Sequence, residues 1–276
     1  MLQATIEQSL IFAIMVLGVY ISFRILNFPD MTVDGTFPLG AAISAKLLTL
    51  GVNPYLTLLV ALVAGAAAGA ITGLIHVKLK VKDLLAGILV MTALYSVNLR
   101  VMGKSNIPLF EEDNIFNTEY SMMITIVVLI LISKFILDYL LKTKFGFALK
   151  ALGDNENLIV SLGLNEEKYK IYGLMIANAF VAFSGAVLAQ YQGFADVGMG
   201  TGIIVIGLAS IIIGDTIFGK RRLAGTTIVI IGSILYRGVI AVTLSMGMDA
   251  SDLKLITSVI VIVILWIQKQ KDKRRK

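Results

Sequence analysis

Two carboxylates, Asp30 and Asp34, lie in a stretch of the chain (residues 27–38) that also holds two prolines and a glycine. Proline removes a backbone donor and clashes with the preceding helical turn, so this stretch is expected to interrupt a helix rather than continue one. Between membrane helices, such an interruption persists only beside protein or a water-filled cavity that satisfies its backbone. The stretch, extended to residue 40, is therefore a candidate lining of a solute pathway, and a loop outside the hydrocarbon is the alternative.

A second interruption, at residues 193–202, holds four glycines and Asp196. In membrane transporters, interrupted segments in the two halves of the chain point to the substrate path. We therefore expect both interruptions to line one translocation pathway, again with an external loop as the alternative. The residues expected along this pathway are Asn27, Phe28, Asp30, Asp34, Thr36, Phe37, Asp196 and Arg237.

Arg237 is the one charged residue in the apolar run at residues 223–248. It lies about 14 residues, or about 21 Å along a helix, from the inner end of that run, which places it in the outer half of a membrane. A charge at this depth needs a partner and is functional by default. Arg237 could therefore line an outer vestibule or pair with a carboxylate, and snorkelling to the outer interface is the alternative.

The longest polar stretch, residues 142–170, has a different character. Gly153 and Asp154 predict a turn in which Asp154 caps a short helix at about residues 155–162, which ends at Gly163. The apolar side chains on one face of this helix would suit docking on a soluble partner, and a plain surface connector is the alternative. The residues expected at the contact are Gly153, Asp154, Asn155, Leu158, Ile159, Leu162 and Gly163.

No motif for catalysis is present in the sequence. It has no phosphate-binding loop and no Gly-x-Ser-x-Gly motif, so we expect no ATP hydrolysis and no serine hydrolase chemistry from this chain. It has no cysteine and a single histidine, His76, which excludes multi-histidine and thiolate metal sites. We expect neither an enzyme nor a bound cofactor or metal.

The composition indicates that these candidate residues are positioned by helices in a membrane. The chain has 276 residues, of which 57% are hydrophobic and 15% are charged, with a mean hydropathy of +0.88. A soluble domain is typically about 45–50% apolar and about 25% charged, so a bilayer must cover part of this apolar surface. The net charge of +6 comes from basic clusters between apolar runs, which indicates cytoplasmic loops rather than nucleic-acid binding.

We therefore predict an all-α, polytopic membrane protein with a single domain (residues 1–276) and about eight to nine helices, some broken or re-entrant. The helices are expected at about residues 5–24, 37–50, 53–78, 83–102, 121–141, 171–190, 203–218, 223–244 and 253–268. The second of these is too short for a full span. An external N-terminus and a cytoplasmic C-terminus put 18 of the 24 basic residues on the inner side.

Several sequence pieces resemble the permease subunits of ATP-binding cassette (ABC) importers of the branched-chain amino acid (LIV) type. The resemblance is closest to the group linked to tryptophan and other aromatic amino acids. The matching pieces are LNFPDMTVDGTFPLGAA at residues 26–42, GFALKALGDN at 146–155, LGL at 162–164, FSGAVLAQ at 183–190 and GDTIFG at 214–219.

The resemblance implies a type II importer-like permease in the inner or plasma membrane of a bacterium. Two copies, expected as a homodimer, would surround a central pathway lined by the segment at residues 27–36. The loop around residues 153–163 would be the coupling helix on an ATPase subunit that binds ATP and Mg, and an extracellular or periplasmic binding protein would deliver the solute. LIV permeases carry an Asn-Phe-Ala-His-Gly-Asp type of sequence where this chain has NFPD at residues 27–30, which argues against a branched-chain substrate.

The function expected from these features is import of a small organic solute by alternating access. An amino acid is the leading substrate class, with aromatic amino acids as one candidate. The alternative is an ATP-independent secondary transporter or channel that would use Asp30, Asp34 and Arg237 as ion or proton sites.

Overall fold

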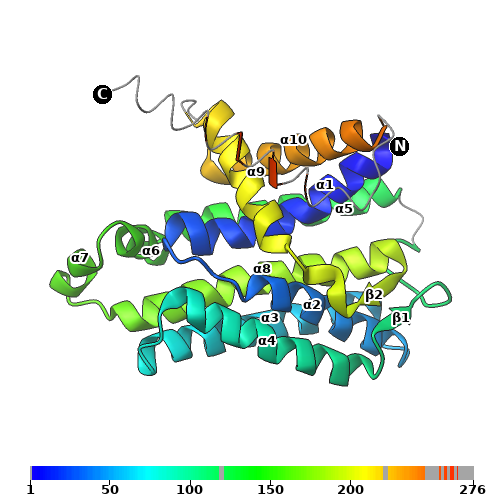
Figure 1. Ribbon diagram of the computed structural model, residues 1–276, viewed down its shortest axis with the longest axis horizontal. Helices are drawn as coiled ribbons and strands as arrows, with labels where there is room; N and C mark the ends of the chain where they lie inside the picture. The colour runs from blue at the N-terminus through cyan, green and yellow to red at the C-terminus, as the bar shows by residue number, and fades with distance from the viewer. Residues whose placement is uncertain are drawn as a thin grey trace.

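The computed structural model describes residues 2–117, 121–219 and 223–245, together with six single positions between 255 and 266. Ten α-helices, one π-helix (η1), one 3-10 helix (η2) and two short strands make up the continuous part of this description (Figure 1). The helices are α1 (Leu2–Val19), η1 (Tyr20–Ile25), α2 (Val33–Leu48), α3 (Pro54–Lys78), α4 (Asp83–Met102), α5 (Met122–Lys142), α6 (Lys144–Asp154), α7 (Glu156–Ser161), α8 (Glu166–Gln192), η2 (Val197–Gly200), α9 (Ile203–Phe218) and α10 (Gly225–Ser245).

Among the described residues, seven helices are long and apolar enough to cross a membrane. They are α1 with η1, α3, α4, α5, α8, η2 with α9, and α10. The all-α prediction and five of the expected spans are confirmed, since α3, α4, α5, α9 and α10 begin and end within two residues of the expected bounds. Residues 220–222, most of the expected helix at 253–268 and the basic tail lie outside the described residues.

The long helices form two groups, which Figure 1 shows one above the other. One group contains α1, α5, α9 and α10, and the other contains α2, α3, α4 and α8. The groups meet where α1 packs on α8, and a Cβ at Gly18 would lie only 2.5 Å from the Ala177 carbonyl oxygen. The absence of a side chain at Gly18 therefore allows this close helix contact.

Glycines also set the contact between α3 and α8. A Cβ at Gly65 would lie 2.4 Å from the Asn178 carbonyl oxygen, and one at Gly69 would lie 2.2 Å from that of Leu174. Gly65 and Gly69, one helical turn apart on α3, therefore serve packing within the chain, which is the ordinary role of small residues on one helix face.

Helix α2 lies at the centre of its group, surrounded by α3, α4 and α8, and most of its side chains are buried. The expected interruption is present at residues 26–32, but α2 begins at Val33, four residues before the expected start at residue 37, and it contains Pro38. Pro38 is the sixth residue of the helix and leaves only the Asp34 carbonyl without its helical donor. Gly200 packs directly on that carbonyl, since a Cβ there would lie 2.0 Å from it.

The two ends of the molecule differ in structure. At one end, α6 and α7 project beyond the long helices; at the other lie the N-terminus and a two-stranded antiparallel sheet (Figure 1). Its strands are β1 (Asn106–Pro108) and β2 (Phe194–Asp196), with Ile107 opposite Ala195. We refer to these as the α6–α7 end and the β1–β2 end.

Candidate functional site

Asp34 joins the two interruptions that the sequence placed far apart. Its Oδ2 accepts a hydrogen bond from the Gly202 backbone N–H at 2.9 Å, and its Oδ1 accepts one from that of Ile204 at 2.8 Å. A carboxylate here satisfies two of the N–H groups left open at the start of α9 and interacts favourably with the helix dipole. One half-buried side chain from the first interruption thus holds the helix that follows the second.

A cavity of about 330 Å³ lies beside this contact. Its walls come from the start of α2, from the middle of α4 and from the segment that contains η2. The lining residues are Asp34, Gly35, Pro38, Met91, Thr92, Tyr95, Asn98, Val197, Gly198 and Thr201. The size falls within the range of about 300–1,000 Å³ that is usual for small-molecule sites.

Three polar side chains of α4 in this cavity were not foreseen from the sequence. Asn98 is fully buried and donates from Nδ2 to the Gly35 carbonyl oxygen at 3.1 Å. Thr92 donates to the Ile88 carbonyl oxygen at 2.8 Å, and Tyr95 is exposed. The available signal was an asparagine within an apolar span, because a polar group at that depth calls for a partner.

Asp30 has a different environment from Asp34, although both were expected along one pathway. It is buried, accepts a hydrogen bond from Asn178 Nδ2 at 2.7 Å, and accepts another from the Thr32 backbone N–H at 2.9 Å. The Thr32 hydroxyl in turn lies 2.7 Å from that of Thr72 on α3. Asp30 therefore fastens the segment before α2 to α8 and α3, and it does not line the cavity.

Three other expected pathway residues also lie outside the lining of that cavity. Asn27 is exposed and has a left-handed backbone, with φ of 52°. Phe28 is buried with its ring edge-on to His76, at 5.1 Å between centroids. Asp196 caps η2 by accepting from the Gly198 N–H at 2.7 Å.

Arg237 lies on α10, against α1, rather than at the cavity. Its guanidinium stacks over the Phe12 ring at 3.8 Å from the centroid, and Nη1 donates to Gln8 Oε1 at 3.4 Å. Phe12 in turn stacks on Phe37, which is buried on α2 next to buried Thr36. These contacts bring Arg237, Phe12 and Phe37 into one stack. Arg237, Phe37 and Thr36 are not among the residues that line the cavity.

The short helix in the polar stretch is present, but its cap differs from the one expected. Asn155, not Asp154, caps α7, because its Oδ1 accepts from the Asn157 N–H at 3.0 Å. Asp154 is instead the last residue of α6, a helix that the sequence did not indicate. Gly163 has a φ of 72° just past α7, a backbone conformation that glycine adopts without strain.

The apolar side chains of α7 divide between two environments. Ile159 is fully buried against the body of the molecule, whereas Leu158 is 46% exposed and Leu162, just after the helix, is 63% exposed. The expected single apolar face is therefore wrong: Ile159 anchors the helix, and the two leucines face outward at the α6–α7 end.

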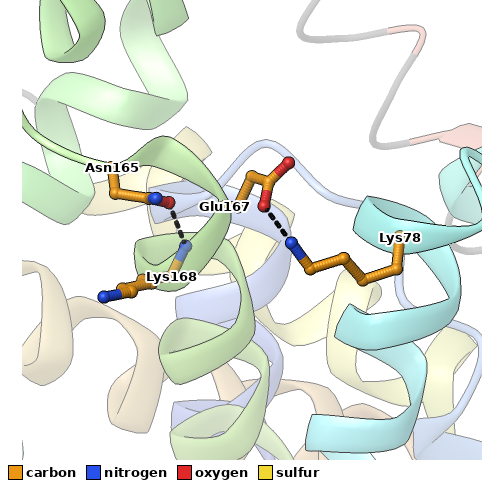
Figure 2. Close-up of polar contacts among 4 residues, drawn as sticks. All are labelled: Lys78, Asn165, Glu167 and Lys168. Atoms are coloured by element: carbon orange, nitrogen blue, oxygen red, sulfur yellow. Dashed lines mark hydrogen bonds and ion pairs between the residues drawn. The ribbon is translucent and has the colours of Figure 1, made fainter.

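Two ion pairs and a helix cap lie at this end. Figure 2 shows Glu167, at the start of α8, and Lys78, at the end of α3, pointing toward one another at 2.6 Å. It also shows Asn165, whose side chain accepts from the Lys168 N–H at 3.0 Å and so caps α8. A further pair, Lys170 with Glu156 at 2.8 Å, ties α7 to α8.

The end of α6 touches the end of η1, immediately before the first interruption. A Cβ at Gly153 would lie 1.9 Å from the Ile25 carbonyl oxygen, the last residue of η1. Gly173 on α8 approaches the same region, since a Cβ there would lie 2.5 Å from Leu26 Cδ1. The segment before α2 is thus in contact with α6 on one side and is clamped by Asp30 on the other.

Within the part of the chain that the structure describes, no group of three His, Asp or Glu side chains could hold a metal ion. The polar groups of the cavity suit hydrogen bonding to a small solute rather than bond-breaking chemistry.

Comparison with known proteins gives consistent results. Residues 1–266 match the family model described as the permease component of a branched-chain amino acid transport system. The chain is 49% identical to the tyrosine transport system permease protein of Clostridioides difficile, over 95% of this chain and 89% of that protein. It is 37% identical to an uncharacterised protein of Rickettsia prowazekii, with 97% of each covered.

Among solved structures, the chain resembles a metal-chelate type ABC transporter in an inward-facing conformation. The TM-score is 0.54 at 15% identity, over 97% of this chain and 84% of that one. This likeness concerns the fold alone.

Proposed function

The chain belongs to the family of permease components of branched-chain amino acid transport systems, and from this premise we propose that it imports an aromatic amino acid. As a membrane subunit of an ABC transporter, it is a transport component that works with ATPase and permease partners. Family membership thus favours an ATP-driven mechanism over the ATP-independent alternative. The observation that carries the substrate proposal is the 49% identity to a tyrosine transport system permease protein.

The cavity beside Asp34 is our candidate for part of the substrate path. Support comes from its walls, which combine both interruptions of the apolar sequence with α4. Broken segments that meet at one point are typical of transporter binding sites. Asp30, Phe28 and Asn27 would act on this path indirectly, because they hold the segment before α2 in position.

The α6–α7 end is proposed to face the cytoplasm and to receive the ATPase. The basic side chains Lys78, Lys142 and Lys170 lie near this end, which fits the positive-inside rule. Leu158 and Leu162 offer an exposed apolar surface for docking, and the Gly153 contact with Ile25 would pass a movement of α6 to the first interruption. The N-terminus would then lie outside.

Two copies of this chain are proposed to form the membrane channel, and a binding protein would deliver the solute at the β1–β2 end. Exposed apolar side chains on α3, α4 and α5 leave ample surface for lipid and for a second permease copy. Selection of the amino acid would be shared between the binding protein and the cavity.

The test is uptake into proteoliposomes that contain this chain with its ATPase and binding protein. We expect ATP-dependent accumulation of radiolabelled tyrosine, phenylalanine or tryptophan, and little accumulation of leucine. Uptake that continues without ATP, or leucine uptake without uptake of any aromatic amino acid, would overturn the proposal.

A further inference from the structure

We propose that the cavity between α2, α4 and η2 binds the ammonium group of the transported amino acid, with Asn98, Asp34 and Thr92 as hydrogen-bond acceptors. This inference rests on the proposed import of an amino acid, and it adds which end of the substrate the permease holds. Each of the three residues lines the cavity, and each has an acceptor atom with unused capacity, for a separate physical reason.

The orientation of the Asn98 amide is set by the backbone. Its Nδ2 donates to the Gly35 carbonyl oxygen, and the opposite orientation would place two acceptor oxygens against each other. Its Oδ1 is buried and, among the described residues, receives no hydrogen bond. An unpaired buried acceptor of this kind costs about 1–3 kcal/mol, so a donor that reaches Oδ1 from the cavity, through a small shift of the wall, gains by satisfying it.

Asp34 supplies the charge. Each of its oxygens accepts one backbone N–H, and each keeps capacity to accept another donor. Among the described residues, no Lys, Arg or His lines the cavity, so the carboxylate faces no described side-chain cation there. A cationic ligand is therefore favoured over an anionic one.

Thr92 can act only as an acceptor toward a ligand, because its hydroxyl proton already takes part in a hydrogen bond within α4. Its hydroxyl donates to the Ile88 carbonyl oxygen, which leaves the oxygen lone pairs as its remaining capacity. An ammonium group carries three donors and no acceptor, and it matches three acceptors from three side chains. A carboxylate would have no donor from these residues.

Tyr95 completes the site for an aromatic substrate. Its ring is 55% exposed and lies along the same cavity. Aromatic side chains favour offset or edge-to-face contact with other rings, so Tyr95 could pack on the side chain of an amino acid whose ammonium lies deeper.

Binding to the permease–ATPase complex without the binding protein tests this inference, because the binding protein would impose its own selectivity. Bound radiolabelled L-tyrosine would be displaced by tyramine, which has the ammonium but no carboxylate. 3-(4-Hydroxyphenyl)propionate has the carboxylate but no ammonium, so it should displace bound tyrosine poorly. Its apparent affinity should be at least about tenfold weaker than that of tyramine. Equal competition by the two analogues would overturn the inference.

Two variants of Thr92 provide a matched comparison at an exposed position. Thr92→Val removes the acceptor at nearly constant shape and should weaken tyrosine binding about 3–10-fold, whereas Thr92→Ser keeps the acceptor and should bind within about twofold of the wild type. Asn98→Leu should weaken binding about 10–100-fold. Unchanged binding in both Thr92→Val and Asn98→Leu would contradict the assignment.

Uptake by the wild-type protein distinguishes failure of the proposed import function from failure of the ammonium site. If no aromatic amino acid accumulates in proteoliposomes, the proposed function fails. If tyrosine accumulates but the isolated complex binds none, or binds the propionate as well as the amine, the ammonium site fails while the function stands.

Discussion

Asp30 and Asp34 lie four residues apart in the sequence, yet their side chains have different surroundings. The Asp30 region is closed: its carboxyl is buried and bonded to Asn178 and Thr32. The Asp34 region is partly open: its carboxylate bonds to the start of α9, and Asp34 lines a cavity whose wall also includes Asn98, with its buried, unpaired Oδ1. The difference teaches that one interruption of a helix can supply both a fixed anchor and a solute-facing wall.

The largest effect is expected from breaking the closed region. Asp30→Leu would leave the Asn178 amide and the Thr32 N–H without this partner, at about 1–3 kcal/mol for each buried group. We expect the amount of folded protein in the membrane and its thermal midpoint to fall sharply, as measured by fluorescent size-exclusion chromatography on heating. Asp30→Asn keeps an acceptor and should lose less. A normal midpoint for Asp30→Leu would show that the clamp is not structural.

The next effect concerns the α6–α7 end, which lies beyond the closed region. Leu158→Asp and Leu162→Asp change exposed side chains, so we expect normal folding with transport and stimulated ATPase activity reduced at least about tenfold. Val160→Asp, on the same helix and 55% exposed, is the matched variant. Comparing its stimulated ATPase activity with that of the leucine variants shows whether the docking surface extends to residue 160. Full ATPase stimulation in both leucine variants would exclude this surface as the coupling site.

A smaller effect is expected in the open region. Asp34→Asn keeps one acceptor oxygen for the start of α9, but it turns an NH2 group toward the second backbone N–H and removes the charge. Because the side chain is only half-buried, the loss of stability should be smaller than that of Asp30→Leu, while tyrosine uptake falls about tenfold. The measurement is the initial rate of uptake, compared at equal amounts of reconstituted protein. A fall in the amount of folded protein as large as that of Asp30→Leu would show that Asp34, like Asp30, has mainly a structural role.

The smallest effect is expected at the surface. Lys78→Met removes the ion pair with Glu167, whose side chains are both substantially exposed, and such pairs contribute about 0–1 kcal/mol. The thermal midpoint and the uptake rate should therefore change little. A large drop in either would mean that the link between α3 and α8 at this end takes part in coupling.

The sequence predicted the membrane helices well because hydropathy averages over about 20 residues. It placed α4 at its observed bounds and α3 within one residue. It missed α6, since the helix has only 11 residues, and it placed the cap of α7 one residue early, because Asp and Asn are almost equal caps.

Side-chain partners could not be predicted in the same way. Nothing in the local sequence separates Asp30 from Asp34, because their difference comes from Asn178 and Gly202, about 150 residues away or more. Pro38 and Gly35 argued against helix before residue 37, yet tertiary packing starts α2 at Val33. Asn98 was overlooked because its partner, the Gly35 carbonyl, lies on another helix.

The central claim, that substrate passes the cavity beside Asp34, can be tested by cysteine labelling, since the chain contains no native cysteine. Thr201→Cys would place a thiol in the cavity wall, and Glu111→Cys would place one on the exposed loop after β1. We predict that a membrane-impermeant methanethiosulfonate reagent labels both variants from outside but blocks tyrosine uptake only in Thr201→Cys. Complete labelling of Thr201→Cys with unchanged uptake would contradict the account.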